Sequence, residues 1–386
     1  MNRIPYGRQN ITEDDLRAMQ ETLLSDFITT GPRVEEFESA FAEYVDSDYA
    51  VAVSNGTAAL HLAMLTLKER PGKKVITSPI TFLASANCII YAGMEVDFAD
   101  IDPRTFLIDL NKIEDKLRKD KKGSYAGIIP VDFAGYPVNT EDLRTLADKY
   151  SLWILEDSCH APGGWFRDSG GKEVKCGSNM YSDLSIFSFH PVKHITAGEG
   201  GIITTNNKDY YNKLTRLRSH GTTKDPGLMT KNPGGWYYEM QELGYNYRLT
   251  DFQAALANSQ LKRLDENIRL RKRIAARYDQ AFENIDSIDT PFIEEQVSHA
   301  FHLYVIKTSR RKELYDYLFE NNIFSQVHYI PVHLQPYYRE LGWSEGDFPL
   351  AEAYYERCLS LPVYPTLSND EQEYVIERVL EFSERY

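Results

Sequence analysis

One lysine occupies an unusual place in this sequence, on a tight turn between two strand-like segments. Lys193 follows the apolar residues 184–189 and Pro191, and a glycine-rich return leads into the apolar residues 201–205. Lysine is normally found on solvated helix faces. A lysine that is desolvated between buried strands loses its proton more readily, and its amine then attacks a carbonyl to form a Schiff base. The local residues alone are also compatible with a surface lysine in an exposed loop.

An acidic residue ends another apolar segment, because Asp157 closely follows residues 152–155. An unpaired carboxylate at the end of an apolar strand is costly, so we expect a buried cationic partner. A protonated pyridine nitrogen is such a partner, and the pair would keep the ring an electron sink. A structural salt bridge or a helix N-cap would also account for the residue.

Two further turns offer groups that suit a flat phosphorylated molecule. Gly56 and Thr57 lie where a strand passes into a helix, and the free amides of a helix start bind anions such as phosphate. Phe82 begins the next helix, where its ring either lies against an aromatic ligand or belongs to the core.

Together these residues meet the binding requirements of one cofactor. Lys193 suits a Schiff base, Asp157 a ring nitrogen, and Gly56 and Thr57 with Ser188 a phosphate group, while an aromatic residue covers the ring. No other common cofactor needs that set, so the sequence predicts pyridoxal 5′-phosphate.

The segments that carry these residues alternate between strand and helix. The predicted strands are 49–53, 74–77, 95–99, 126–132 and 152–155, and the predicted helices are 57–68, 82–92, 110–119 and 140–150. Such alternation indicates βαβ units and a mainly parallel, buried sheet, so the fold class is α/β. Ligands of such sheets bind at the carboxyl ends of the strands.

The pattern changes after residue 201. A helix at 209–218 precedes residues 222–247, which lack periodicity, and a loop of that length is usually functional or packs on a partner subunit. A long helix is predicted over 250–279. An α+β set then follows, with strands 300–306 and 324–329 and helices 311–321, 350–359 and 370–382. We therefore predict an N-terminal arm and large domain over residues 1–260 and a small domain over 261–386.

Composition excludes several classes of protein. The 386 residues carry a net charge of -14, which argues against a nucleic-acid binder. The four cysteines lack metal-type spacing and are expected to be reduced, so no metal site is predicted. Because no apolar run resembles a signal core or a membrane span, we expect a soluble, cytoplasmic protein without membrane partners.

The order of these motifs resembles that of the DegT/StrS family of sugar-nucleotide aminotransferases over essentially the whole chain. The motifs are Asn55-Gly56-Thr57, Thr81-Phe82, Glu156-Asp157, residues 187–193 with Gly198-Glu199-Gly200-Gly201, and Asn246-Tyr247-Arg248. The resemblance implies a fold-type I enzyme, in which helices enclose a mostly parallel sheet and a smaller α+β domain follows. It also implies a homodimer with a shared active site.

The resemblance also implies roles for matching residues. Lys193 would form the Schiff base, Asp157 would hold the ring nitrogen, and Phe82 would stack on the ring. The residues implied for the phosphate and the rest of the cofactor are Gly56, Thr57, Ser188, His160 and, from the neighbouring subunit, Asn246. Those implied for the sugar nucleotide are Tyr6, Thr29, Thr30, Gly31, His328, Tyr329, Ile330 and Pro331.

Within the family, the Pro5-Tyr6 start, residues 190–193 and residues 327–338 are most similar to the transaminases of pseudaminic acid biosynthesis. This similarity implies amino transfer from L-glutamate to the 4-keto group of a UDP-linked 4-keto-6-deoxy-N-acetyl amino sugar. Two departures weaken the substrate assignment: Asp132 stands where relatives often carry His, and Ala197 where they often carry Thr.

Three other functions remain open. One is an aminotransferase that acts on another nucleotide keto sugar, of the UDP-arabinose or dTDP-linked type. A second is a related dehydratase, which the presence of Lys193 opposes because those enzymes replace the lysine, typically with His. The third is a regulator that binds pyridoxal phosphate without catalysis.

Overall fold

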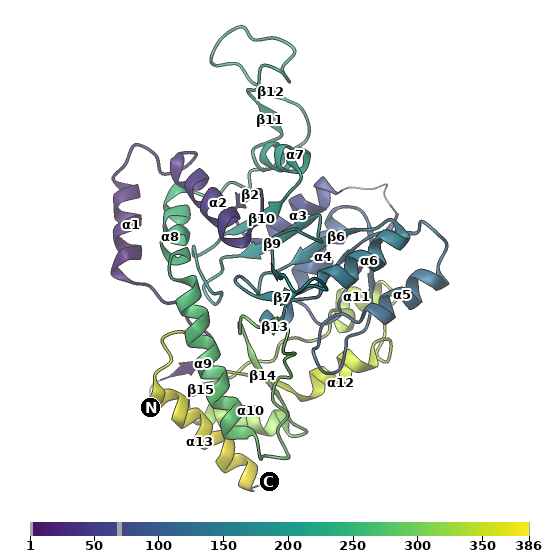
Figure 1. Ribbon diagram of the computed structural model, residues 1–386, viewed down its shortest axis with the longest axis vertical. Helices are drawn as coiled ribbons and strands as arrows, with labels where there is room; N and C mark the ends of the chain where they lie inside the picture. Colours follow the sequence, from purple (N-terminus) through teal and green to yellow (C-terminus); the bar gives the residue numbers. More distant parts are fainter. Residues whose placement is uncertain (1–2, 68–71, 386) are drawn as a thin grey trace.

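A seven-stranded sheet organises the structure, a computed structural model that describes residues 3–67 and 72–385 (Figure 1). The strand order is β2-β10-β9-β6-β5-β3-β4. Only β10 runs antiparallel to its neighbours; the other paired strands in this sheet are parallel. The strands are β2 (Tyr49–Val53), β3 (Lys74–Thr77), β4 (Glu95–Phe98), β5 (Tyr125–Ile129), β6 (Trp153–Asp157), β9 (Leu184–Ser188) and β10 (Gly201–Thr205). The predicted α/β class is confirmed.

Helices cover both faces of this sheet, because alternate residues of each strand point to opposite sides. In β2, Val51 and Val53 pack with α3, α4 and α7, whereas Ala50 and Ala52 pack with α2 and α8. The helices are α1 (Glu13–Leu23), α2 (Pro32–Val45), α3 (Gly56–Thr66), α4 (Leu83–Tyr91), α5 (Leu110–Lys119), α6 (Thr140–Tyr150), α7 (Lys208–Arg218) and α8 (Asp251–Leu261). Across the described ranges, no helix is both long and apolar enough to cross a bilayer.

The C-terminal residues build a second core, in which α9, α10 and α13 pack around β14 and β16 (Figure 1). The N-terminal residues join it, because β1 pairs in parallel with β15. The elements are β1 (Ile4–Pro5), α9 (Leu264–Phe282), β14 (Tyr304–Lys307), α10 (Arg311–Glu320), β15 (Ile323–Phe324), α11 (Pro336–Glu340), α12 (Pro349–Arg357), β16 (Cys358–Leu361) and α13 (Asn369–Arg385). The domain boundary near residue 260 stays a prediction.

The smaller elements include a projecting hairpin and short segments that pack against the core of the large sheet. A hairpin of β11 and β12 forms an arm, residues 222–240, that projects from the body beyond α7 (Figure 1). The remaining elements are β7 (Trp165–Arg167), β8 (Glu173–Lys175), β11 (Thr222–Thr223), β12 (Glu239–Met240), β13 (Val297–Ser298) and the 3₁₀ turns Phe133–Gly135 and Val332–Leu334.

Several sequence predictions differ from the structure, among them the strand predicted over 300–306, which begins only at Tyr304. The helix predicted over 250–279 is two helices, because Arg263 leaves the helical conformation between α8 and α9. The strand predicted over 324–329 ends at Phe324. The helix predicted over 350–359 ends at Arg357, because the residues that follow form β16 and pair with β14. In the last case the pairing of β16 with β14 overrides the local helical pattern.

Candidate functional site

A cavity of about 1060 Å³ lies at the carboxyl ends of the parallel strands. This edge is where α/β sheets bind their ligands, and the volume is large enough for a cofactor together with a substrate. The predicted site residues that line the cavity are Tyr6, Gly56, Thr57, Phe82, Asp157, His160, Ser188, Lys193, His328 and Tyr329.

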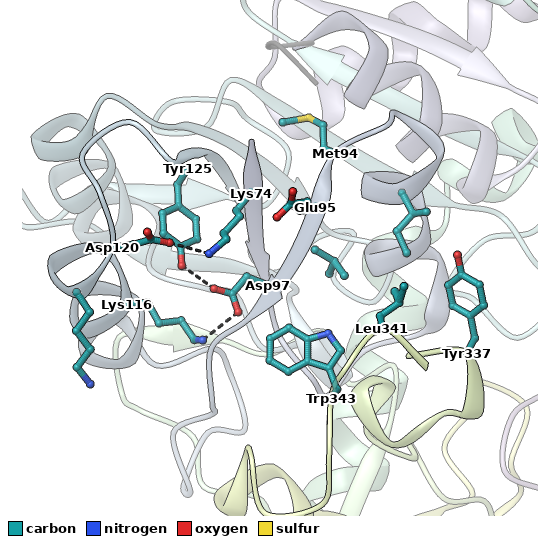
Figure 2. A pocket seen from close by; sticks show the side chains of 13 residues that line it. Lys74, Met94, Glu95, Asp97, Lys116, Asp120, Tyr125, Tyr337, Leu341 and Trp343 are labelled. Carbon is teal, nitrogen blue, oxygen red and sulfur yellow. Dashed lines mark hydrogen bonds and ion pairs between the residues drawn. The ribbon is translucent and has the colours of Figure 1, made fainter. Parts of the chain in front are cut away.

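A second cavity, of about 710 Å³, lies at the opposite edge, where β3, β4 and β5 begin (Figure 2). Four of its charged groups are already paired with one another. Lys74 Nζ lies 2.7 Å from Asp120 Oδ2, and Lys116 Nζ lies 2.9 Å from Asp97 Oδ1. Asp97 also accepts a 2.6 Å hydrogen bond from the Tyr125 hydroxyl. Because these charges neutralise one another and lie away from the carboxyl ends, we assign the chemistry to the first cavity.

Lys193 is carried by a closed turn between β9 and β10. The turn begins and ends at a backbone bond, in which Phe189 N–H donates to Gly200 O at 2.8 Å. Within it, Lys193 N–H donates to His190 O at 2.9 Å. The side chain is partly exposed and lines the cavity. The turn therefore presents the amine to the cavity from the end of a central strand.

The surroundings of Lys193 favour its neutral form. Desolvation by burial lowers the pKa of the Lys193 ammonium, while the charges of Cys159 and Asp157 oppose the shift. A lowered pKa increases the fraction of free amine near neutral pH, and the free amine is the form that attacks a carbonyl.

Asp157 ends β6, is 5% exposed, and accepts hydrogen bonds from neutral donors. The Ser85 hydroxyl donates to Asp157 Oδ2 at 2.6 Å, and Cys159 N–H donates to Oδ1 at 3.2 Å. The Ser85 oxygen also lies 2.8 Å from the Thr81 hydroxyl, so one short chain of hydroxyls orients the carboxylate. These donors stabilise the carboxylate without neutralising it, so its charge is available to a cation in the cavity.

The end of β9 and the start of α3 lie close together at one end of the cavity, which we call the anion end. Asn55 caps α3 by accepting a 2.8 Å hydrogen bond from Ala58 N–H. A Cβ on Gly56 would lie 3.0 Å from Ser188 Cβ and 3.2 Å from Ser188 Oγ, so glycine is required for this approach. The amides that begin α3 and the Ser188 hydroxyl thus face the same space, which suits a phosphate group.

His160 connects the sheet edge to the segment that contains Tyr329. Its Nδ1 accepts from Ala134 N–H at 3.2 Å, so in the neutral ring the proton is on Nε2, which donates to the Tyr329 hydroxyl at 3.3 Å. Burial lowers the pKa of His160 well below its usual value, and repulsion from Lys193 adds to the effect. The ring is therefore a neutral element of the cavity wall.

Phe82 stands at the cavity mouth as the N-cap residue of α4. Its side chain is 58% exposed, and its ring centroid lies 6.2 Å from that of Tyr329. A large apolar ring that is left this exposed beside a cavity is available to cover a flat ligand.

Several predicted residues lie outside the cavity lining of this chain: Thr29, Thr30, Gly31, Asn246, Ile330 and Pro331. Thr29 pairs with Thr250, and Gly31 N–H donates to the Asp251 carboxylate at 2.8 Å. Asn246 pairs with Ser219. Their predicted roles in binding stay predictions.

The structure adds residues that sequence reasoning missed. Tyr245 and Tyr247 line the cavity, and their rings stack with centroids 5.1 Å apart. Their spacing on either side of Asn246 carried a signal, because alternate residues of an extended segment point the same way. Ser85 carried none, since its contact with Asp157 depends on how α4 packs.

The side chains present fit pyridoxal phosphate. The cradle at Gly56 would be filled by a Cβ, the donors on Asp157 leave its negative charge for a ring nitrogen, and Lys193 has a lowered pKa. Each observation meets a separate requirement of that cofactor.

Comparison with known proteins agrees with this geometry. The sequence model of the DegT/DnrJ/EryC1/StrS aminotransferase family matches residues 9–380. The chain is 39% identical to the spore coat polysaccharide biosynthesis protein SpsC of Bacillus subtilis, over 97% of this chain and 96% of the relative. It is 36% identical to the UDP-4-amino-4,6-dideoxy-N-acetyl-beta-L-altrosamine transaminase of Campylobacter jejuni, over 99% of this chain and 98% of the relative.

Solved structures are similar over the same extent. Helicobacter pylori PseC, described as an aminotransferase involved in the biosynthesis of pseudaminic acid, superposes with a TM-score of 0.90 at 29% identity, over 100% of both chains. The PMP form of the putative sugar aminotransferase Spr1654 from Streptococcus pneumoniae superposes with a TM-score of 0.91 at 30% identity, over 99% of both chains.

Proposed function

Because this chain belongs to the DegT/DnrJ/EryC1/StrS aminotransferase family and is a pyridoxal-phosphate-dependent enzyme, we propose that it transfers the amino group of L-glutamate to a nucleotide-linked keto sugar. The proposed acceptor is the 4-keto group of a UDP-linked 4-keto-6-deoxy-N-acetyl amino sugar, and the product is the 4-amino sugar nucleotide. The observation that carries the proposal is the presence of Lys193, Asp157 and the Gly56 cradle in one cavity.

Each residue has a defined task in this reaction. When bound, the cofactor supplies a carbonyl for the Schiff base and a cationic ring that accepts electrons. Lys193, whose pKa is lowered by burial, moves the proton at the carbon that gains or loses nitrogen. Asp157 would keep the ring nitrogen protonated, and the Ser85 hydroxyl orients Asp157 by its hydrogen bond. Ser188 and the first amides of α3 bind the phosphate.

The choice of sugar rests on relatives and on the walls of the cavity. The Campylobacter relative is named for a UDP-linked 4-amino-4,6-dideoxy sugar, which corresponds to the product proposed here, and the Helicobacter structure is named for pseudaminic acid biosynthesis. Tyr6, His328 and Tyr329 line the cavity in this chain, and the Tyr6 and His328 rings lie 5.0 Å apart. SpsC, named for spore coat polysaccharide, supports a second candidate, an aminotransferase that acts on another nucleotide keto sugar.

We also propose a cytoplasmic homodimer in which two chains share each active site. Thr29, Thr30, Gly31 and Asn246 lie outside the cavity of their own chain, so a partner is needed if they are to contact ligand. The projecting arm bears exposed apolar side chains, among them Trp236 at 75% exposure. Side chains of this kind are typical of a surface that another chain covers. The four free thiols are compatible with the reducing cytoplasm.

Absorbance spectroscopy tests the chemistry. We expect the purified protein with pyridoxal phosphate to be yellow, and L-glutamate to shift its band toward the near ultraviolet. Lys193→Ala should remain folded and lose turnover. A protein that stays colourless with added cofactor would overturn the enzyme assignment and favour the regulator. UDP-linked and dTDP-linked keto sugars are then added separately to the glutamate-treated protein. The sugar that restores the yellow form is the acceptor.

Mixed dimers test the shared site. Lys193→Ala and Asn246→Asp, which places a carboxylate near the phosphate, should each be inactive. If Lys193 and Asn246 of different chains serve one site, a mixture that exchanges subunits regains activity, because one site of each mixed dimer has both native residues. Absence of recovery in a mixture with demonstrated exchange would refute the shared site.

A further inference from the structure

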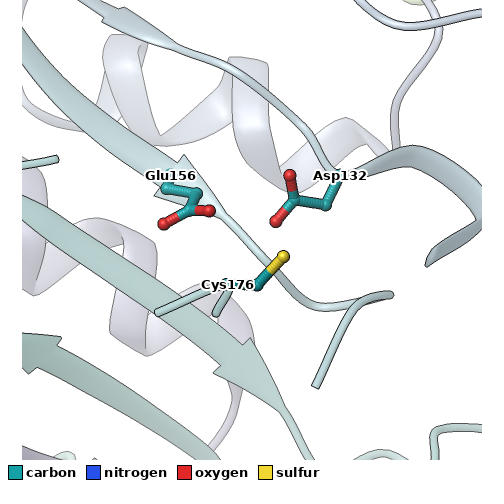
Figure 3. Close-up of side chains that lie close together, drawn as sticks. All are labelled: Asp132, Glu156 and Cys176. Atoms are coloured by element: carbon teal, nitrogen blue, oxygen red, sulfur yellow. The ribbon is translucent and has the colours of Figure 1, made fainter. Parts of the chain in front are cut away.

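Three buried side chains lie together next to the strand end that carries Asp157. Oxygens of Asp132 and Glu156 and the sulfur of Cys176 all lie within 4.8 Å of one another. Figure 3 shows the two carboxyl groups and the thiol turned toward a common point. Glu156 precedes Asp157 in β6, so its side chain points to the opposite face of the sheet. Asp132, one of the departures from the family pattern, follows β5.

The hydrogen bonds around Glu156 stabilise its ionised form. Its Oε2 accepts from the Ser185 hydroxyl at 2.6 Å, from the Ser182 hydroxyl at 3.3 Å and from Gly177 N–H at 3.3 Å. Three donors that converge on one oxygen are the arrangement expected for a buried carboxylate.

Asp132 is bonded differently at its two oxygens. Oδ1 accepts from Val138 N–H at 2.8 Å, whereas Oδ2 is fully buried and has no partner in good hydrogen-bond geometry. The Ser158 hydroxyl and the Cys176 thiol are the neutral groups that interact with this carboxyl. A buried carboxylate oxygen without a donor is costly. The cost disappears if Oδ2 carries a proton and donates to the neighbouring carboxylate of Glu156.

The charge balance leads to the same result. Among the ion pairs of the described residues, none involves Asp132 or Glu156. Two buried carboxyl groups this close, with no cation between them, do not both ionise. Burial raises the pKa of Asp132 well above its usual value, and repulsion from Glu156 adds to the shift. Burial also raises the pKa of Glu156, while its donors oppose the shift.

We propose that Asp132 and Glu156 share one proton, carried on Asp132 Oδ2, and that this bond ties the ends of β5 and β6 together behind Asp157. The backbone continues the link: Asp132 N–H donates to Asp157 O at 3.1 Å, and Asp157 N–H donates to Pro130 O at 2.9 Å. Asp132 is thus a positioning residue that acts through β6. This role rests on the proposed function of Asp157 as the partner of the ring nitrogen, whereas the shared proton does not.

A metal ion bound by the same three side chains is the competing explanation. It would need a thiolate at Cys176, but burial raises the pKa of that thiol well above its usual value, and repulsion from Asp132 adds to the effect. Both carboxyl groups would also have to ionise. Figure 3 shows the two carboxyl groups and the thiol close together. A proton shared between the carboxyl groups requires neither a thiolate nor two ionised carboxyl groups, and we therefore favour it over an ion.

Infrared spectroscopy tests the shared proton directly. At about pH 8 exposed carboxyl groups are ionised, so a protonated-acid carbonyl band at that pH reports a buried neutral carboxyl. We expect the wild-type protein to show this band and Asp132→Asn to lack it. Metal analysis accompanies the measurement. Absence of the band in the wild-type protein, or a stoichiometric metal that Asp132→Asn releases, would overturn the proposal.

Cofactor affinity tests the positioning role. In Asp132→Asn the amide oxygen still accepts from Val138 N–H, and the amide nitrogen donates to Glu156 in place of the shared proton. We expect cofactor affinity to stay within about twofold of wild type in Asp132→Asn and to fall roughly tenfold in Asp132→Ala. Equal affinities in both variants would refute positioning. A wild-type protein that shows the infrared band but binds no cofactor would refute only the proposed role of Asp157.

Discussion

Gly56→Ala is the substitution that most directly tests the anion end of the cavity. The added Cβ would lie 3.0 Å from Ser188 Cβ and 3.2 Å from Ser188 Oγ. Rotation of the serine side chain can move the hydroxyl but not Cβ, so the end of β9 must separate from the start of α3 by a few tenths of an ångström. Both elements contribute to the same phosphate site. Overpacking of this kind costs about 1–3 kcal/mol.

The cost should appear in cofactor binding more than in folding. Without cofactor the half-buried Ser188 can shift into the cavity, whereas bound phosphate requires β9 and α3 at their native separation. We therefore expect the dissociation constant for pyridoxal phosphate to rise about 5- to 150-fold, with a small change in thermal midpoint. Absorbance titration of the apoprotein measures the constant, with pyridoxamine phosphate as a second ligand.

A double-mutant cycle isolates the contact. Ser188→Gly removes the Cβ that the new methyl group would meet, so Gly56→Ala should weaken binding much less in that background than in the wild type. Gly170→Ala is the matched control, because its Cβ would meet only Asp168 Oδ1, 3.3 Å away in an exposed loop far from the cofactor site. If Gly56→Ala binds cofactor within about twofold of wild type, or if the cycle shows no coupling, the steric argument is wrong.

Three other perturbations test separate parts of the site. Ser85→Ala removes a 2.6 Å bond to the Asp157 carboxylate and should slow the glutamate half-reaction roughly 10- to 100-fold; stopped-flow absorbance measures this, and an unchanged rate would contradict the assigned role. Lys193→Met should stabilise the apoprotein, because the folded-state pKa of Lys193 is depressed. That gain should be present below the folded pKa and vanish as pH approaches the unfolded value of about 10.4, so melting curves with a constant difference would refute it. Tyr329→Phe removes the hydroxyl bonded to His160 and should raise KM for the keto sugar about 2- to 10-fold, while cofactor affinity is retained.

Sequence reasoning predicted the sheet well because apolar residues recur at different intervals in strands and in helices. The end of each strand could be located to within a few residues, and this placed Asp157, Ser188 and Lys193 at one edge. The predictions that were wrong concerned features that depend on contacts between residues far apart in the sequence. Arg263 ends the helical run where its guanidinium bonds Asp15 and Asn10 O, and nothing in residues 250–279 signals this.

The site was predicted in part for a similar reason. Residues inside motifs at strand ends could be named, because the carboxyl ends of parallel strands meet at one edge. Ser85 reaches Asp157 through the packing of α4, which one-dimensional spacing does not encode. The spacing of Tyr245 and Tyr247 indicates that they share a side of an extended segment, but not that this side faces the cavity. The hydrophobic periodicity of a single chain does not show which residues contact a partner chain.

The closed turn that carries Lys193 is held together by residues that are close in the sequence, so the position of the amine depends mainly on local contacts. Its ends are joined by the bond from Phe189 N–H to Gly200 O, and β9 and β10 pair on from there. The cavity walls at Tyr6 and Tyr329, by contrast, come from distant parts of the sequence. Insertions and deletions in those walls can therefore accumulate over evolutionary time without displacing the nucleophile. A lineage can change the sugar that it accepts while it inherits its chemistry intact.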